Sequence, residues 1–297
     1  MSTKKIISSK VDPLRKINFK DNFGKQYYTV SFYDKADNSV NLCVSSQIGC
    51  VEKCAFCATG DAPFIRNLTQ AEMEEQYTEG IKVLSDFSTE NHPRTLYIIL
   101  EGMGEASYNL ANCLSGFSSF FESSANEFDK IAFRVSTAGN VSLIAPYKQF
   151  ITRESPKMPN VQFQFQVSLH TPFDEERRFL VPRFGIDYPI GEMIPQFKKF
   201  ADFLKSPLKF NYMLLRYPDG RINYSQKHLE KLVSISAPLN ARVKLTKYSD
   251  TGKGFLSPSG EVYEDIRIFL ETNGVKTSIR PLFGLDINAA CGMLDYR

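Results

Sequence analysis

Three cysteines stand close together in the chain, at Cys50, Cys54 and Cys57, with the spacing C-x3-C-x2-C. Iron-sulfur clusters are usually held by four cysteine thiolates. A loop that supplies only three, with Gly49 before it and Gly60 after it, can close around a cluster and leave one iron without a protein ligand. The amino and carboxylate groups of S-adenosylmethionine are the ligand that this spacing suggests for the open iron.

A zinc site and a set of buried structural thiols are the alternatives to a cluster. Zinc takes four ligands and usually finds them in paired C-x2-C units, and no second pair follows in this chain. The spacing therefore favours an iron-sulfur cluster over zinc.

Other segments also carry residues that could take part in chemistry. The sequence GMGE from Gly102 to Glu105 suits either a glycine turn that closes a strand or a loop around a cofactor. Its carboxylate could pair with an ammonium group. His170 suits either a structural role or a cofactor contact, and Cys291 alone suits a small buried thiol. Cys113 lies in the apolar helical pattern LANCLSGF, where we expect it to pack in the core.

The elements that must position these residues alternate between extended and helical segments. Residues 26–32 and 40–44 flank the polar turn DKADN and predict a β-hairpin. The cysteine loop follows the hairpin and ends at a helix, because Thr69 and Glu72 form a capping-box pattern. Later strands are predicted at 95–100, 131–135, 161–169, 208–214, 242–245 and 276–279, and helices at 110–121, 141–150, 174–180, 190–204, 225–234 and 260–271.

Apolar strands separated by helical stretches predict an α/β protein with a parallel sheet wound by right-handed crossovers. About six units fit, fewer than in a complete eightfold barrel. In such barrels the loops after the strands build the active site. The segments 102–105, 136–139 and 168–170 all follow predicted strands, so we expect them to meet at one end of the barrel.

Composition and charge exclude several classes of protein. The 297 residues, 42% hydrophobic and 23% charged, suit a globular protein with a sizeable core. No apolar run is long enough to span a membrane, and the start MSTKKIISSK lacks the apolar core of a secretory signal. Six cysteines in such a chain suit metal or catalytic use in a reducing, cytoplasmic setting.

The net charge of +3 does not by itself identify a nucleic-acid binder, but the first stretch is markedly basic. It could be a cationic arm that contacts phosphates, or a solvated and partly disordered tail. We expect residues 1–38 to form a short basic extension with the start of the hairpin, and residues 39–297 to form the barrel domain with a C-terminal cysteine tail.

Taken together, the motifs resemble those of the RlmN/Cfr family of radical S-adenosylmethionine (radical SAM) RNA methyltransferases. The resemblance runs from about Asn41 to Leu294 and includes a cysteine seven positions before the cluster motif, Cys43, and a second near the end, Cys291. Its pieces, in the order of the family, are CVSSQIGCVEKCAFCATG, FIRNLT, GMGE, VSTAG, SLHTPFDEERR and DINAACGML.

The resemblance implies a partial (β/α)6 TIM-type barrel of the radical SAM type with an N-terminal β-hairpin extension. It implies a 4Fe-4S cluster on Cys50, Cys54 and Cys57, with adenosylmethionine on the open iron. The residues that match the adenosylmethionine-binding positions of the family are Gly104, Glu105, Ser136, Ser168, Leu169, His170 and Ser249.

The resemblance also implies roles for the two remote cysteines. The carbons C2 and C8 of adenine are too weakly nucleophilic to attack a sulfonium methyl group directly, so the family uses a radical route. Cys291 takes a methyl group from one adenosylmethionine, and a second adenosylmethionine supplies the 5'-deoxyadenosyl radical that activates that methyl. The methylene adds to adenine, and Cys43 resolves the covalent adduct by forming a disulfide, which a reductant reopens.

Several positions depart from the family pattern. Members usually carry a further N-terminal domain, so the resemblance implies a shortened form. They usually have a Glu in the extended segment before Cys43, whereas Tyr27, Tyr28 and Thr29 occupy that region here. Ala106 replaces the proline after GMGE, and the segment 245–249 lacks an Asn that would contact the cofactor.

The expected substrate is RNA, because looped or flipped adenines suit a concave barrel mouth. The family targets an adenosine of 23S ribosomal RNA, at C2 or C8, and in some members a tRNA adenosine. Two alternatives stay open: the same chemistry on a small molecule or peptide, and a non-catalytic RNA-binding relative. We also expect a flavodoxin-like external electron donor and a monomer. Candidate phosphate contacts are Arg66, Lys244, Lys247, Lys253 and Arg280.

Overall fold

The computed structural model describes residues 3–85, 93–124 and 127–295, and a ten-stranded sheet runs through it in the order β1-β2-β3-β4-β7-β8-β9-β10-β11-β12. From β4 onward all neighbouring strands of this sheet are parallel. These strands are β4 (Ser39–Val44), β7 (Thr95–Leu100), β8 (Lys130–Thr137), β9 (Val161–Ser168), β10 (Lys209–Met213), β11 (Arg242–Thr246) and β12 (Lys276–Ile279).

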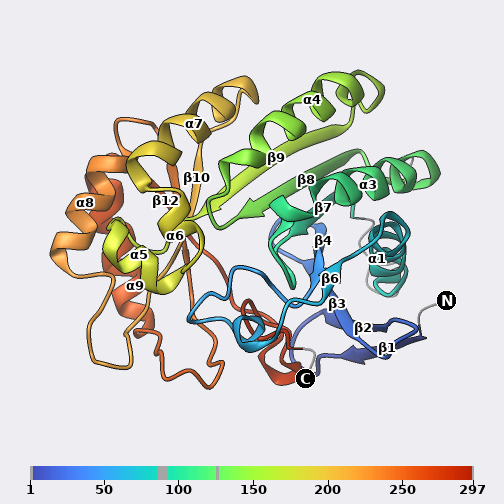
Figure 1. Cartoon of the computed structure of the whole chain (residues 1–297), viewed down its shortest axis with the longest axis horizontal. Helices are drawn as coiled ribbons and strands as arrows, with labels where there is room; N and C mark the ends of the chain where they lie inside the picture. The colour runs from blue at the N-terminus through green and yellow to red at the C-terminus, as the bar shows by residue number, and fades with distance from the viewer. Residues whose placement is uncertain (1–2, 86–92, 125–126, 296–297) are drawn as a thin grey trace.

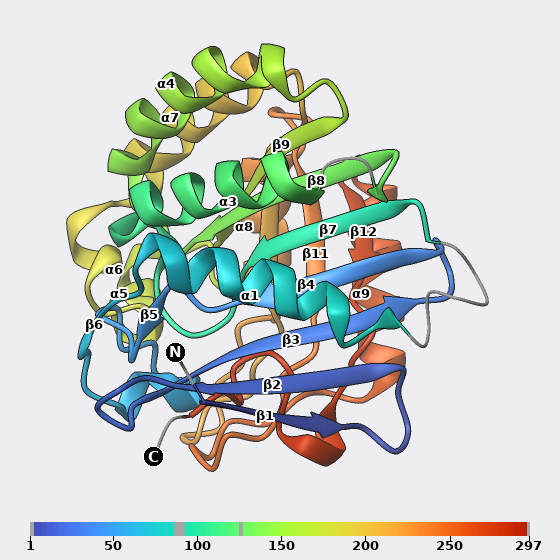
Figure 2. The same cartoon turned by 90° about the vertical axis from the view of Figure 1, so that its right-hand side faces the viewer.

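Helices join the parallel strands and cover the outer face of the curved sheet (Figure 1). They are α1 (Gln70–Lys82), α3 (Leu110–Ser124), α4 (Ile144–Glu154), α5 (Asp174–Leu180), α6 (Phe184–Asp187), α7 (Ile190–Phe203), α8 (Gln226–Ser236) and α9 (Gly260–Thr272). Figure 2 shows α1, α3 and α4 side by side across the strands. The predicted partial barrel with about six βα units is confirmed, and the short helix α6 was not predicted.

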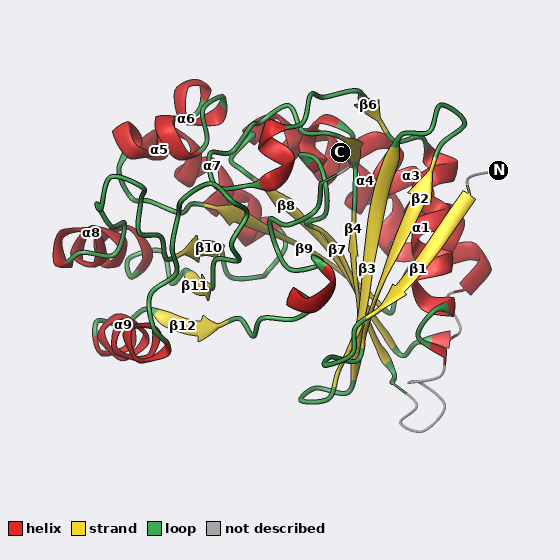
Figure 3. Ribbon diagram, turned by 90° about the horizontal axis from the view of Figure 1, so that it is seen from below, coloured by secondary structure: helices red, strands yellow, loops and turns green. Residues whose placement is uncertain are grey.

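The first strands extend the sheet beyond the barrel. β1 (Thr3–Ser8), β2 (Leu14–Lys20) and β3 (Gln26–Asp34) pair antiparallel in order, and β3 pairs antiparallel with β4. The predicted hairpin is therefore confirmed. The alternative that the basic first stretch forms a disordered tail is wrong. Apolar side chains of β2 such as Ile17 and Phe19 are buried and hold this segment on the sheet. Figure 3 shows these strands projecting to one side of the barrel.

The main core lies between the sheet and its helices. Phe117 and Phe120 of α3 pack with Tyr77 of α1 and Phe133 of β8. Cys113 is fully buried in this cluster, as its apolar helical pattern predicts. Among the described residues, no helix is both long and apolar enough to cross a lipid bilayer.

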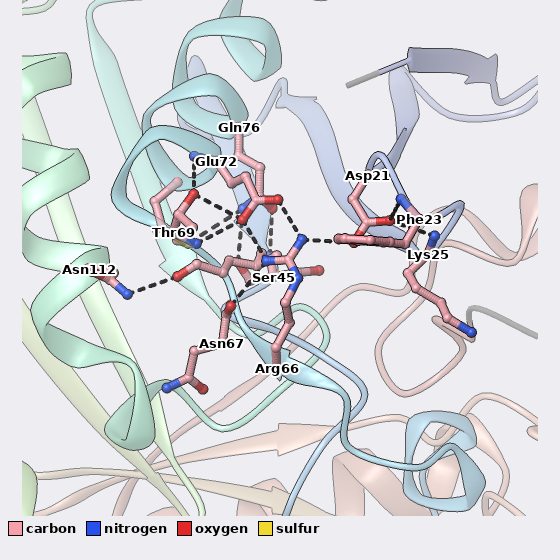
Figure 4. A network of polar contacts seen from close by, with 12 residues as sticks. Asp21, Phe23, Lys25, Ser45, Arg66, Asn67, Thr69, Glu72, Gln76 and Asn112 are labelled. Carbon is pink, nitrogen blue, oxygen red and sulfur yellow. Dashed lines mark hydrogen bonds and ion pairs between the residues drawn. The ribbon is translucent and has the colours of Figure 1, made fainter. Parts of the chain in front are cut away.

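The start of α1 is fixed by the predicted capping box. The Glu72 backbone N–H donates to Thr69 Oγ1, and the Glu72 carboxylate accepts from the Thr69 backbone N–H at 2.8 Å. Arg66 bridges Glu72 to Asp21 at the tip of the β2–β3 hairpin, with N–O distances of 2.7 and 2.9 Å (Figure 4). This network ties the N-terminal extension to the helix that follows the cysteine loop.

Replacing Thr69 with alanine is expected to lower the free energy of unfolding by about 1 kcal/mol, because the first turn of α1 loses a backbone N–H partner. Urea unfolding monitored by circular dichroism checks this value. Thr69→Ser, which keeps the hydroxyl, is the control and is expected to stay close to the unsubstituted protein. An equal loss in both variants would contradict a capping role.

Candidate active site

A cavity at the carboxyl ends of the parallel strands brings together most of the predicted site residues. Its wall includes strand ends from β4, β7, β8, β9, β10 and β11, the cysteine loop and the C-terminal tail. The predicted residues that line it are Cys43, Cys50, Cys54, Cys57, Gly104, Glu105, Ser136, Ser168, His170 and Cys291.

The cysteine loop lies between β5 (Gln47–Ile48) and a short 3-10 helix, η1 (Ala58–Asp61). Gly49 begins the loop with φ of +77°, and a Cβ atom there would lie 2.2 Å from the Pro63 carbonyl oxygen. A side chain at this position would clash with backbone, so the turn requires glycine. The turn directs Cys50, Cys54 and Cys57 into one cavity.

These three thiols fit a cluster better than they fit a single metal ion. Among the described residues, no group of three or more His, Cys, Asp or Glu side chains is arranged to hold one ion. In a 4Fe-4S cluster each thiolate binds a different iron, so the sulfurs need to surround the cluster rather than converge on one point. Burial raises the pKa of Cys50 to about 12 and raises the pKa of Cys54 well above the usual value of a thiol, and the neighbouring thiols add to both shifts. Thiolates in this position require the positive charge that bound iron supplies.

Glu105 and Gly104 follow β7 directly beside this loop. Gly104 has φ of +103°, and a Cβ atom there would lie 2.6 Å from Gln47 Cβ, so glycine permits the close packing. The Glu105 carboxylate is buried and accepts hydrogen bonds from the backbone N–H groups of Ala138, at 2.8 Å, and Ser107, at 3.1 Å. Burial raises its pKa, although these hydrogen bonds oppose the shift. A cationic ammonium group would stabilise this carboxylate.

His170 ends the β9 loop in a left-handed backbone conformation with φ of 58°. Its Nδ1 accepts a hydrogen bond from the Met213 backbone N–H at 3.1 Å, and Phe56 of the cysteine loop packs edge-on against the ring. This hydrogen bond assigns the ring proton to Nε2. Burial lowers the pKa of His170 to about 3, so the ring is neutral and can donate only through Nε2.

Unfolding should therefore become easier in acid partly because of His170. Its pKa in the folded protein is about 3, against 6.5 for an unperturbed histidine, so the unfolded chain binds the proton first. The contribution of the neutral His170 ring to the free energy of unfolding is complete above pH 6.5. It is lost as the pH falls from 6.5 toward about 3, at up to about 1.4 kcal/mol per pH unit.

We expect His170→Asn, which also tolerates positive φ, to remove this dependence. Urea unfolding at about pH 7 and about pH 5 gives the free energy of unfolding of the unsubstituted protein and of the His170→Asn protein. The difference between these two free energies should be smaller at the lower pH by roughly 1–3 kcal/mol. Parallel losses of stability in both proteins would contradict the assignment.

Cys43 and Cys291 reach the same cavity from opposite ends of the chain. Cys43 lies on β4, and Cys291 lies on the tail after a 3-10 helix, η6 (Leu285–Ile287). The tail is held against the cysteine loop, where the Ala58 N–H donates to the Gly292 carbonyl oxygen at 2.8 Å and Thr59 Oγ1 donates to Leu294 O. Burial raises the pKa of both thiols. The two sulfurs and the three cysteines of the loop therefore share one cavity.

The sequence did not single out Glu101, the most heavily hydrogen-bonded carboxylate of the cavity. Its Oε1 accepts from Ser136 Oγ and Asn211 Nδ2, both at 2.8 Å, and from Gln166 Nε2. Its Oε2 pairs with Arg280 at 2.8 Å. A signal was available, because Tyr97 and Ile99 share one face of β7 and Glu101, directly after the strand, continues their alternation. A polar residue on this inner face needs partners.

Two predicted cofactor contacts do not line the cavity. Leu169 is fully buried, and its carbonyl oxygen accepts from Arg177. Ser249 is also buried, and its Oγ has no hydrogen-bond partner among the described residues.

The candidate phosphate contacts are mostly engaged within the protein. Arg66 pairs with Asp21 and Glu72, Lys253 pairs with Asp61, and Arg280 pairs with Glu101. Burial lowers the pKa of Lys244 to about 8, and Lys247 lines the cavity. Among these five, Lys247 and Arg280 line the cavity, and the Lys247 ammonium group lies over the Tyr263 ring.

Known proteins resemble this chain in sequence and in fold. A probable dual-specificity RNA methyltransferase RlmN from Prochlorococcus marinus is 32% identical over 259 residues, which cover 87% of this chain and 67% of that protein. A protein of the same name from Syntrophomonas wolfei is 31% identical, with 88% and 70% covered. The crystal structure of a radical SAM methyltransferase from Sphaerobacter thermophilus superposes with a TM-score of 0.85 at 30% identity and covers all of this chain and 82% of that one. No family model matches the chain.

Proposed function

The chain belongs to the RlmN family of radical SAM methyltransferases, and we propose that it methylates a ring carbon, C2 or C8, of an adenosine in ribosomal or transfer RNA. The names of its relatives support an RNA substrate. The observation that carries the proposal is the single cavity that holds Cys43, Cys291 and the three cysteines of the loop.

The cofactors proposed for this cavity are a 4Fe-4S cluster on Cys50, Cys54 and Cys57 and adenosylmethionine, two molecules per turnover. When bound, they supply a methyl group and a radical that removes hydrogen from a methyl group. Glu105 orients the cofactor by pairing with its ammonium group. His170 donates from Nε2, and Ser136 and Ser168 complete the polar wall.

The two cavity thiols outside the cysteine loop, those of Cys43 and Cys291, carry out the covalent steps. Cys291 carries the methyl group, and after one hydrogen atom is removed from this group its carbon bonds to the adenine ring. The ring carbon loses its hydrogen as a proton, and one electron passes back to the external electron donor, so that the Cys291 sulfur is linked through the transferred carbon to the ring. Cys43 then attacks the Cys291 sulfur, so an S–S bond forms and the C–S bond breaks. The electron pair stays with the transferred carbon, which takes up a proton and becomes the methyl group. An external donor of two electrons and two protons reopens the disulfide.

Anaerobic reconstitution with iron and sulfide, followed by addition of adenosylmethionine and a low-potential chemical reductant, tests this proposal. Mass spectrometry should find a methyl group on Cys291, and incubation with ribosomal and transfer RNA followed by nuclease digestion should yield 2-methyladenosine or 8-methyladenosine. A methylated Cys291 without any methylated RNA would favour a small-molecule or peptide substrate. An unmethylated Cys291 would contradict the proposed mechanism.

A further inference from the structure

A buried ion pair lies beside Cys43, and the proposed chemistry so far gives it no role. Glu101 follows β7, Arg280 follows β12, and their side chains are 7% and 20% exposed. Cys43 pairs with Ile99 in the β4–β7 register, so Glu101 lies just beyond the strand partner of Cys43. Glu101, Arg280, Cys43 and Cys291 all line the same cavity.

The contacts of Glu101 suit a carboxylate that holds Arg280 in place rather than one that accepts a proton. Donors from β8, β9 and β10 occupy its Oε1, and Arg280 occupies its Oε2. Burial alone would raise the pKa of this carboxyl, but Lys244 and Arg280 hold it well below the usual range. A carboxylate with all these partners is a weak base, and its effect is to fix the guanidinium of Arg280.

The Cys43 sulfur needs a cation beside it. The thiolate is the nucleophile in thiol exchange, and burial and then Glu101 raise the pKa of Cys43. The groups that face it are Glu101 from β7, Arg280 from the segment after β12 and Cys291 from the tail, while β3 places the apolar Val30 opposite it. Among these described groups Arg280 is the cation, and it opposes the rise.

We propose that Arg280, fixed by Glu101, is a positioning residue that places its positive charge beside the Cys43 sulfur for the attack on the Cys291 sulfur. In that step the S–S bond forms, the bond from the Cys291 sulfur to the transferred carbon breaks, and its electron pair stays on the carbon, which takes a proton from water. This inference rests on the proposed function, because that proposal supplies the attack of Cys43 on the Cys291 sulfur. The position of the Arg280 charge relative to Cys43 does not depend on the RNA.

The test measures the reactivity of Cys43 in the cluster-reconstituted protein without RNA. A Cys291→Ala background prevents disulfide formation, and iodoacetamide alkylation of the Cys43 peptide is followed by mass spectrometry across a pH series. Into this background we would introduce Arg280→Gln, Arg280→Lys and Glu101→Gln. Alkylation of the buried Cys113 reports on general loosening of the fold.

We expect Arg280→Gln to slow Cys43 alkylation about tenfold, since one pKa unit changes the thiolate fraction tenfold. Arg280→Lys should restore most of the rate, and Glu101→Gln should slow alkylation by roughly threefold or more because the Arg280 guanidinium loses the carboxylate that fixes it. Slower alkylation in both glutamine variants, with Cys113 unchanged, supports the proposal.

Equal rates in all variants, or faster alkylation of Cys43 in either glutamine variant, would overturn the proposal. Glu101→Gln is nearly isosteric, so its expected slowing still tests the proposal if Arg280→Gln does not fold. Because no RNA is present, failure of this inference and failure of the RNA methyltransferase proposal are separate results.

Discussion

Replacing Cys43 with alanine is expected to stop turnover with the protein covalently joined to its RNA and to lower the rate of product release by roughly a thousandfold or more. The reason is geometric. Cys291 keeps its place on the tail and can still carry the methyl group to adenine, but the cavity then holds no second thiol outside the cluster loop to attack its sulfur.

Denaturing electrophoresis of the reaction with labelled RNA, before and after nuclease digestion, measures this adduct. Cys113→Ala is the matched control, because Cys113 is buried in the core away from the cavity. It should cost about 1 kcal/mol of stability and leave no adduct. Normal release of methylated RNA by the Cys43→Ala protein would remove Cys43 from the mechanism.

Replacing Arg177 with methionine is expected to lower the free energy of unfolding by about 3–5 kcal/mol. Arg177 of α5 is fully buried and donates to the carbonyl oxygens of Ser168 and Leu169, both at 3.0 Å, and to that of Ala138. These carbonyls end β8 and β9, where two of the proposed cofactor loops begin. Methionine fills similar volume but leaves all three oxygens without their donor.

Urea unfolding of the Arg177→Met protein measures the loss. The neighbouring Arg178 is exposed, so Arg178→Met is the control and should change stability by less than about 0.5 kcal/mol. The Arg177→Met protein should also bind adenosylmethionine more weakly, because the loops that carry Ala138 and Ser168 lose the side chain that links them. A loss of stability as small as that of the control would show that water satisfies these carbonyls.

Much of the fold could be predicted from short stretches of sequence. The boundaries of β7 and α5 and the capping box at Thr69 depend on alternation, helical spacing and one hydrogen-bonding side chain. These are interactions between residues a few positions apart, so their sequence pattern contains the information that places them. The basic first strands were the exception, because the burial of Ile17 and Phe19 depends on the sheet that β3 provides.

The sequence by itself determined the chemistry available to this protein. The spacing of Cys50, Cys54 and Cys57 is local, and the turn that begins their loop requires glycine at Gly49. Only the tertiary structure decided what surrounds Cys43 and Cys291. Glu101 and Arg280 are 179 positions apart, and their ion pair exists because the curved sheet brings the end of β12 across the barrel from β7. A buried carboxylate and a buried guanidinium are stable only when they lie next to each other. The sequence places Glu101 and Arg280 far apart, so their pairing could be recognised only in the folded barrel.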